Sequence, residues 1–142
     1  MMSRGAASKA YTAYIDGAAR GNPGPAAVGV VLMQGGQTVD RYGESIGRAT
    51  NNVAEYRAFI KALEMAVDRG ASSLQVFTDS ELLSKQWSGA YRVKNPGLKD
   101  LYQRARQLES GLARVAVSHV PRENNREADR LCNQALDDAG ED

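Results

Sequence analysis

The period of the apolar pattern changes near residue 50, and this change limits the chain to folds that combine strands with helices. Before it, the segments 11–16, 26–33 and 38–46 alternate or are β-branched, which is typical of strands. A turn-rich stretch, GAARGNPGP, separates the first two segments, and a Gln-Gly-Gly-Gln turn separates the last two. The three segments therefore predict an antiparallel meander.

After residue 50, apolar residues return every three or four positions, which is the helical period. One helix face carries Val53, Tyr56, Ile60, Leu63 and Val67, and Gly70 follows as a stop signal. Beyond it the pattern predicts a strand over 74–78, helices over 80–87 and 95–111, and a strand over 115–120. A last helix carries the apolar residues from Ala128 to Leu136. Helical crossovers before the last two strands favour parallel pairing. The predicted fold is α/β, a five-stranded mixed sheet flanked by helices in the order βββαβααβα.

The length of 142 residues, with 42% apolar and 25% charged residues, suits one domain, which we predict over 11–137. Residues 1–10 are small and polar and predict a disordered tail, and the acidic residues 138–142 are expected to fray. No apolar run is long enough to span a bilayer, so we expect a cytoplasmic protein without a membrane partner. The single cysteine, Cys132, lies among apolar residues and is expected in the core.

Two carboxylates are predicted to meet at one edge of the sheet. Asp16 ends the first predicted strand and Asp79 ends the fourth. If these strands are parallel neighbours, both side chains emerge where ligand sites of open α/β sheets form. Like charges so close repel unless they are protonated or bridged by metal, and hard oxygen ligands suit magnesium or manganese. The net charge of +1 is by itself a weak signal for a nucleic-acid binder.

Two further acidic residues have competing interpretations from the local sequence. Glu55 follows Asn52 by three positions, which is the spacing of a capping box at a helix start. Metal binding and capping are equally compatible with that position. Asp129 lies in the opening turns of the last helix, where a solvated charge is the simpler interpretation.

The four acidic residues, taken with their flanks, resemble type 1 ribonuclease H. The matching stretches follow the family's order and span nearly the whole chain: YIDGAARGNPG (14–24), TNNVAEY (50–56), FTDS (77–80) and PRENNREADRL (121–131). The short stretch around Lys94–Leu98 is similar to the compact bacterial and archaeal subgroup, without a long basic protrusion. Residues 11–137 would then be a ribonuclease H domain.

The resemblance implies a hydrolase that cuts the RNA strand of an RNA–DNA hybrid and leaves 5′-phosphate and 3′-hydroxyl ends. Its metal ligands would be Asp16, Glu55, Asp79 and Asp129, holding two Mg²⁺ ions with Mn²⁺ as a substitute. We expect a monomer whose partner is the hybrid duplex. The residues that contact the hybrid would be Asn22, Thr50, Asn51 and Asn52. Turns and helix capping are the structural alternatives for these four positions.

Two more side chains are candidates for assisting near the scissile phosphate. Arg122 follows Pro121 in the loop after the last strand and could contact phosphate. His119 matches a spacing found in some relatives, but its alternation with Val115 and Val117 favours a buried core histidine. Trp87 could support a DNA sugar, although core packing is the favoured interpretation.

Two other functions remain open at this point. The chain could be a hybrid-binding module without activity, although it keeps all four acidic residues. It could also be another nuclease of the same fold, because fold does not determine function. Metal-dependent cleavage of competing substrates distinguishes these possibilities.

Overall fold

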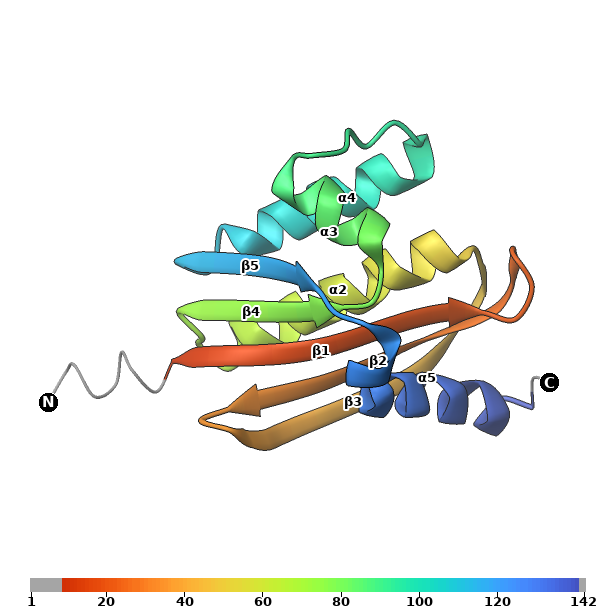
Figure 1. The fold of residues 1–142 in the computed structure, drawn as a ribbon, viewed down its shortest axis with the longest axis horizontal. Helices are drawn as coiled ribbons and strands as arrows, with labels where there is room; N and C mark the ends of the chain where they lie inside the picture. Colours follow the sequence, from red (N-terminus) through yellow and green to blue (C-terminus); the bar gives the residue numbers. More distant parts are fainter. Residues whose placement is uncertain (1–8, 141–142) are drawn as a thin grey trace, which may run out of the picture.

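Residues 9–140 are described in the computed structural model, and they form one five-stranded sheet with helices on both faces (Figure 1). The elements follow the predicted order, with one added 3-10 turn before the last helix. Their bounds are β1 (Ala10–Ala19), β2 (Gly24–Gln34), β3 (Gln37–Ala49), α2 (Asn51–Asp68), β4 (Ser73–Thr78), α3 (Glu81–Ser88), α4 (Pro96–Glu109), β5 (Arg114–His119), η1 (Arg122–Asn124) and α5 (Arg126–Asp138). The prediction of a mixed α/β sheet is confirmed.

The strands lie in the order β3-β2-β1-β4-β5, so β1 is central. β1, β2 and β3 pair antiparallel, as the short turns between them predict. β4 pairs parallel to β1, and β5 pairs parallel to β4. The helical crossovers therefore have the predicted effect, because a parallel neighbour requires a long connection.

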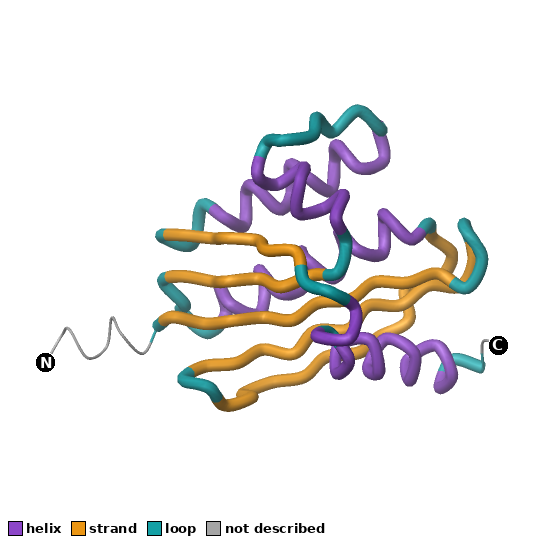
Figure 2. The backbone as a smooth tube through the Cα atoms, in the orientation of Figure 1, coloured by secondary structure: helices purple, strands orange, loops and turns teal. Residues whose placement is uncertain are grey.

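The two faces of the sheet are covered unequally (Figure 2). Helices α2, α3 and α4 lie on one face, and α5 lies on the other across β1, β2 and β3. The main core fills the first interface with large side chains, among them Ile15, Leu32, Phe59 and Leu63, which are fully buried. Burial of these apolar side chains stabilises the fold by about 1.5–3 kcal/mol each.

Helix α2 begins where Thr50 caps it. The Thr50 hydroxyl accepts a hydrogen bond from the Val53 backbone N–H at 3.2 Å, which satisfies one of the free donors of the first turn. Tyr56 is buried on the predicted apolar face, and its hydroxyl donates to Gln86 Oε1 at 2.6 Å. This bond ties α2 to α3.

Arg106 joins α3 to α4 through two aromatic rings. Its guanidinium lies 3.6 Å from the centroid of the Trp87 ring and donates to the Trp87 carbonyl and the Tyr102 hydroxyl. Trp87 also packs edge-on against Phe59 and is buried. The expectation of core packing for Trp87 is confirmed, and the cation–π contact adds to it.

Helix α5 packs so closely on the second face of the sheet that its backbone contacts the backbone of the strands. A Cβ atom built on Gly29 would lie 2.2 Å from the Ala128 carbonyl oxygen, and one on Gly43 would lie 2.9 Å from the Leu131 carbonyl oxygen. Only glycine permits such an approach. Cys132 is fully buried beside Ala27, so its expected place in the core is confirmed.

The predicted tail, residues 1–10, lies outside the described residues except for its last two members. Of these, Ala10 opens β1. At the other end α5 includes Asp138, which the sequence analysis expects to fray, and residues 141–142 lie outside the described part. Among the described residues, no helix combines the length and the apolar character needed to cross a membrane.

Candidate active site

Asp16 and Asp79 lie side by side because their strands pair in parallel register. The last parallel pair is Ile15 with Thr78, and each aspartate is the residue that follows its member of this pair, with Asp79 directly after the end of β4. The expected juxtaposition is therefore present, although Asp16 does not end its strand. β1 continues to Ala19 because its antiparallel pairing with β2 extends three residues further.

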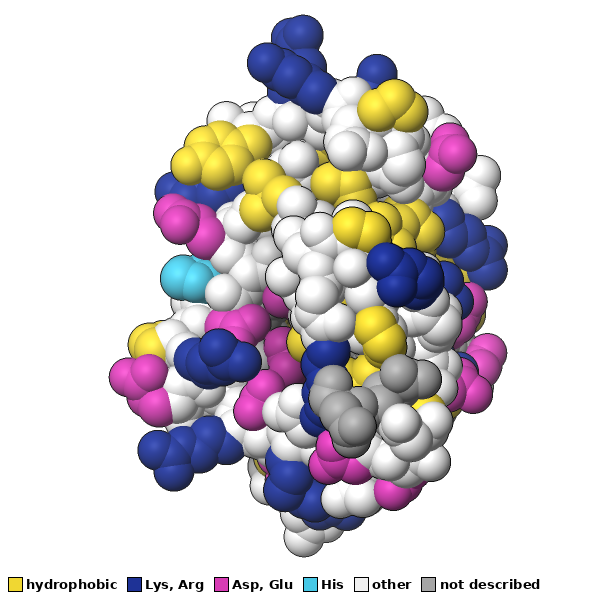
Figure 3. Space-filling model, turned by 90° about the vertical axis from the view of Figure 1, so that its right-hand side faces the viewer, with side chains coloured by type: hydrophobic (Ala, Val, Ile, Leu, Met, Phe, Trp, Pro, Cys, Tyr) yellow, Lys and Arg dark blue, Asp and Glu magenta, His cyan; other side chains and the backbone are white. Residues whose placement is uncertain are grey.

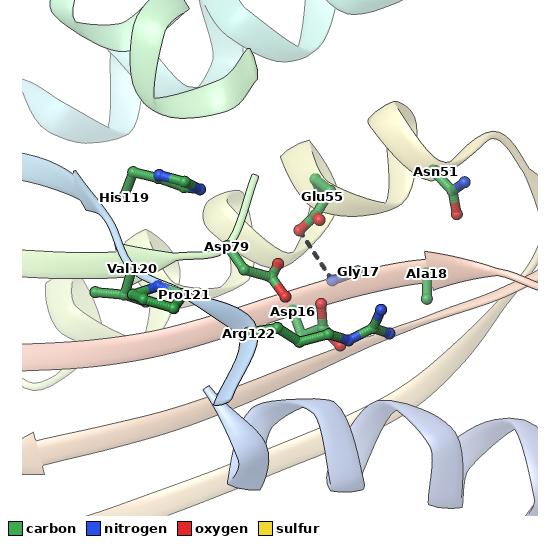
Figure 4. A pocket seen from close by; sticks show the side chains of 10 residues that line it. All are labelled: Asp16, Gly17, Ala18, Asn51, Glu55, Asp79, His119, Val120, Pro121 and Arg122. Atoms are coloured by element: carbon green, nitrogen blue, oxygen red, sulfur yellow. Dashed lines mark hydrogen bonds between the residues drawn. The ribbon is translucent and has the colours of Figure 1, made fainter. Parts of the chain in front are cut away.

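Glu55 reaches the same point from helix α2. Of the two interpretations left open for Glu55, the capping box is wrong, because Thr50 and not Asn52 caps the helix. Glu55 Oε1 instead accepts a hydrogen bond from the Gly17 backbone N–H at 3.1 Å (Figure 4). A Cβ atom on Gly17 would lie 2.2 Å from the Ala54 carbonyl group, so glycine is required for α2 to approach β1 here.

Asp16, Glu55 and Asp79 form what we call the carboxylate cluster. One oxygen from each lies within 4.8 Å of the others, and their side chains point toward one another in Figure 4. Asp129 is not a member of this close group, but its carboxyl neighbours Asp16. Of the four ligands predicted from the sequence, the fold brings three together and places the fourth beside them.

Burial and mutual repulsion make the cluster unfavourable as free anions. Burial raises the pKa of Asp16 to about 8, assisted by the charge of Asp79 and the adjacent Asp129. Burial also raises the pKa of Glu55 well above its usual range, with the charge of Asp16 adding to the effect. The pKa of Asp79 is raised mainly by burial. Each shift favours the neutral acid in the absence of a counter-charge.

The residues present fit a divalent metal ion. Asp16 Oδ2 is buried and has no hydrogen-bond partner among the described residues, which is costly for a carboxylate oxygen unless a cation coordinates it. The donors are all carboxylate oxygens, the ligands that Mg²⁺ and Mn²⁺ prefer. A bound cation would reverse the unfavourable pKa shifts by stabilising the ionised acids.

An open cavity of about 530 Å³ lies over the cluster, and its lining includes Asn51, His119 and Arg122. In the face shown in Figure 3, acidic side chains line a hollow and basic side chains lie around it. The cluster is thus accessible to a polyanion whose charge the metal and the basic rim could balance.

The amide edge, which we define as Asn22, Thr50 and Asn51, continues from this cavity. Asn51 Oδ1 accepts from the Ala19 backbone N–H at 2.8 Å, and Asn22 Oδ1 accepts from the Asn51 backbone N–H at 3.0 Å. Both amide oxygens therefore accept hydrogen bonds from the backbone. Both side chains are exposed, so their NH₂ groups remain available to donate hydrogen bonds to a ligand. Asn52 is exposed in the first turn of α2.

Comparisons with known proteins agree with this geometry. A family model described as reverse transcriptase-like matches residues 14–135. A ribonuclease H of Methylococcus capsulatus is 38% identical, and the match covers 89% of this chain and 88% of that protein. The chain belongs to the ribonuclease H family.

The type 1 branch is supported by closer relatives. Ribonuclease HI of Halobacterium salinarum is 52% identical over 128 residues. The crystal structure of RNase H1 from that archaeon superposes with a TM-score of 0.88 at 50% identity, covering 91% of this chain and 98% of that one. LC11-RNase H1, solved in complex with an RNA/DNA hybrid, has a TM-score of 0.87 at 41% identity with the same coverage of both chains. The resemblance to type 1 ribonuclease H is confirmed.

Some relatives are longer than the region that matches. The alignment covers 89% of this chain but 64% of the Halobacterium ribonuclease HI. It covers 35% of a bifunctional protein of Mycobacterium tuberculosis that is 45% identical. This ribonuclease H chain therefore corresponds to one part of those proteins.

His119 and Arg122 differ from each other in their surroundings. His119 is exposed at the end of β5, so the core-histidine interpretation is wrong. Val115 and Val117 do pack against the core, but His119 is the last residue of this edge strand and lies beyond that contact. Arg122 lies in η1, and its Nη2 is 3.6 Å from Asp129 Oδ1. Both side chains line the cavity, as the sequence analysis allows.

Asn125 is a site residue that the sequence analysis missed. Its side chain is buried and donates from Nδ2 to the Ile15 carbonyl at 2.7 Å, next to Asp16. The backbone carbonyl of Asn125 accepts a hydrogen bond from the Asp129 backbone N–H at 3.1 Å. Asn125 thus connects the backbones of two acidic residues. The doubled asparagine before the last helix was the available signal, but it resembles an ordinary turn.

Proposed function

We propose that this chain is a metal-dependent endoribonuclease that hydrolyses the RNA strand of RNA–DNA hybrids and leaves 5′-phosphate and 3′-hydroxyl ends. The observation that carries the proposal is the carboxylate cluster, with its oxygens within 4.8 Å of one another under an open cavity. The family membership and the solved complex of LC11-RNase H1 with a hybrid support the choice of substrate.

Asp16, Glu55 and Asp79, with Asp129 beside them, would hold the metal, for which we propose two Mg²⁺ ions with Mn²⁺ as a substitute. Divalent metal at such a site supplies Lewis acidity for in-line displacement at the phosphorus. The protein contributes the fixed placement of the carboxylates. Gly17 and Asn125 hold this placement through backbone hydrogen bonds, so little reorganisation is needed during the reaction.

Recognition of the hybrid would depend on the amide edge. The free NH₂ groups of Asn22 and Asn51 can donate to acceptors in a wide minor groove, including 2′-hydroxyl oxygens and base edges. Thr50 lies at the N-terminus of α2, where a DNA phosphate is favoured, and Asn52 is available in the first turn. Arg122 would contact the substrate backbone near the site of cleavage. For the rim residue His119 we propose an assisting role.

The test is cleavage of an end-labelled hybrid with Mg²⁺, Mn²⁺ or EDTA, beside the same lengths of duplex DNA and duplex RNA. We expect metal-dependent cuts in the RNA strand of the hybrid alone, abolished in Asp79→Asn and retained in the matched control Asp100→Asn, whose side chain is exposed on α4. Hybrid binding without cleavage would support a binding module, and cutting of duplex DNA would support another nuclease of this fold. The monomeric state and the cytoplasmic location stay predictions.

A further inference from the structure

Arg122 extends over the carboxylates from the turn between β5 and α5 (Figure 4). Its positive charge opposes the rise in pKa that burial causes at Asp16, Glu55 and Asp79. The side chain is 76% exposed, and an ion pair with Asp129 is its only salt bridge within residues 9–140. A long, exposed side chain with one weak partner can exchange that partner at little cost.

Asp129 occupies an intermediate position. Its carboxyl interacts with the Asp16 carboxyl, and its Oδ1 lies 3.6 Å from Arg122 Nη2. It is the one proposed ligand outside the close group of three. While Arg122 neutralises it, the carboxylate has less charge to offer a metal ion, because the guanidinium competes for the same oxygen and repels a second cation.

We propose that Arg122 is a positioning residue that withholds Asp129 from the metal until substrate is bound. In the free protein the guanidinium pairs with Asp129. A substrate phosphate offers Arg122 a better partner, since guanidinium and phosphate match in shape and charge, and Asp129 is then released to the metal. This inference rests on the proposed function of the cluster.

Two consequences follow for binding. Metal and hybrid must each strengthen the binding of the other, because a coupling free energy is reciprocal. Removing the guanidinium must strengthen metal binding to the free protein while weakening hybrid binding. An arginine that only contacts phosphate would not act through Asp129.

The experiment is calorimetric titration of substrate-free protein with Mn²⁺. We expect Arg122→Gln to bind Mn²⁺ about two- to fivefold more tightly than the wild type, the range for a partly exposed ion pair. In an Asp129→Asn background the same substitution should have a smaller effect, limited to the action of the Arg122 charge on the other three carboxylates. Arg126→Gln, which removes an exposed charge from the start of α5, is the matched control and should leave the affinity unchanged.

The other possible results of this titration contradict either the inference about Arg122 or the proposed function. An equal gain with and without Asp129 would show that Arg122 repels the metal through space and does not withhold a ligand. Unchanged Mn²⁺ affinity in Arg122→Gln would remove the inference and leave the proposed function intact. Absence of Mn²⁺ binding by folded wild-type protein would remove both.

Hybrid binding in EDTA tests the second half of the exchange. Arg122→Gln should bind the hybrid more weakly at low salt, and the slope of log affinity against log salt should fall by about one, as expected when one phosphate contact is lost. Arg126→Gln again serves as the control. An unchanged slope would contradict transfer of Arg122 to a phosphate.

Discussion

The carboxylate cluster and the amide edge lie next to each other but contribute to the stability of the fold with opposite signs. In the cluster, burial and repulsion raise the pKa of each acid, and one buried oxygen of Asp16 has no partner. At the amide edge, Asn22 and Asn51 accept backbone hydrogen bonds, and the proposed recognition of the hybrid would use only their outward NH₂ groups. The proposed metal site therefore destabilises the metal-free protein, whereas the proposed strand-recognition groups also stabilise it.

The largest expected effect separates activity from stability within the cluster. Asp16→Asn should reduce cleavage by about 10³-fold or more, because it removes a proposed metal ligand, and such a ligand is worth several kcal/mol in the transition state. In EDTA the same variant should unfold at a higher temperature than the wild type, because it removes a buried, repelled carboxylate. Rate assays and thermal unfolding check the two halves. A variant that is less stable than the wild type would contradict the proposed origin of the strain.

Gly17→Ala should come next, with a loss of about 3 kcal/mol in the free energy of unfolding. The new methyl group would lie 2.2 Å from the Ala54 carbonyl group, so α2 must move away from β1. Because this movement also carries Glu55 away from the Gly17 N–H, Mn²⁺ affinity should fall with stability. Denaturant unfolding and calorimetry measure both. Gly35→Ala, in the turn between β2 and β3 where a Cβ meets no atom within 4 Å, is a control for loss of glycine, although its positive φ adds a small strain of its own.

The pH dependence of the metal-free protein gives the third effect, of about 2–3 kcal/mol between pH 6 and pH 9. The pKa of Asp16 is raised from 3.8 to about 8, so the folded state binds its proton more tightly than the unfolded state. The resulting stability is fully present below about pH 4 and is lost as the pH rises through 8. Unfolding in EDTA should therefore show lower stability at pH 9 than at pH 6. The pH dependence of stability should be weaker in Asp16→Asn. An equal dependence in both proteins would show that a group other than Asp16 causes it.

The smallest effect on stability is expected at the amide edge. Asn51→Asp keeps an oxygen to accept from Ala19 but replaces the outward donor, so hybrid binding should weaken about tenfold while unfolding changes little. Asn51→Ala loses both functions and should also cost about 1 kcal/mol in unfolding free energy. Hybrid affinity and unfolding, measured side by side, distinguish the two variants. Equal losses of stability in Asn51→Asp and Asn51→Ala would show that the hydrogen bond to Ala19 at the end of β1 does not stabilise the fold.

Local pattern was sufficient to predict most of the fold. The change of apolar period at residue 50 and the helical crossovers predict the order of elements and the parallel pairing of β4 with β1. That pairing was also enough to predict that Asp16 and Asp79 meet. These features depend on properties that repeat along a segment, so they can be recognised without the tertiary structure.

The errors concern single hydrogen bonds between distant segments. Glu55 fits a capping box locally, but its actual partner is the N–H of Gly17, 38 positions away. Asn125 resembles a turn residue, but it is buried and bonded to Ile15, 110 positions away. The exposure of His119 follows from the edge position of β5, which the strand's own residues do not encode. Such contacts depend on which segments the fold brings together.

The glycines beneath α5 have a consequence for how the spacing of the acidic residues could be altered. Since the helix rests on the backbone at Gly29 and Gly43, the thickness of this layer is set by the absence of side chains and cannot adapt by a change of rotamer. A methyl group at Gly29 would lift the start of α5 as a unit and carry Asp129 with it. The separation of Asp129 from the other three carboxylates is thus adjustable from beneath the helix, at a buried position outside the cavity. A protein engineer seeking different metal selectivity would therefore begin with the sheet and leave the acids unchanged.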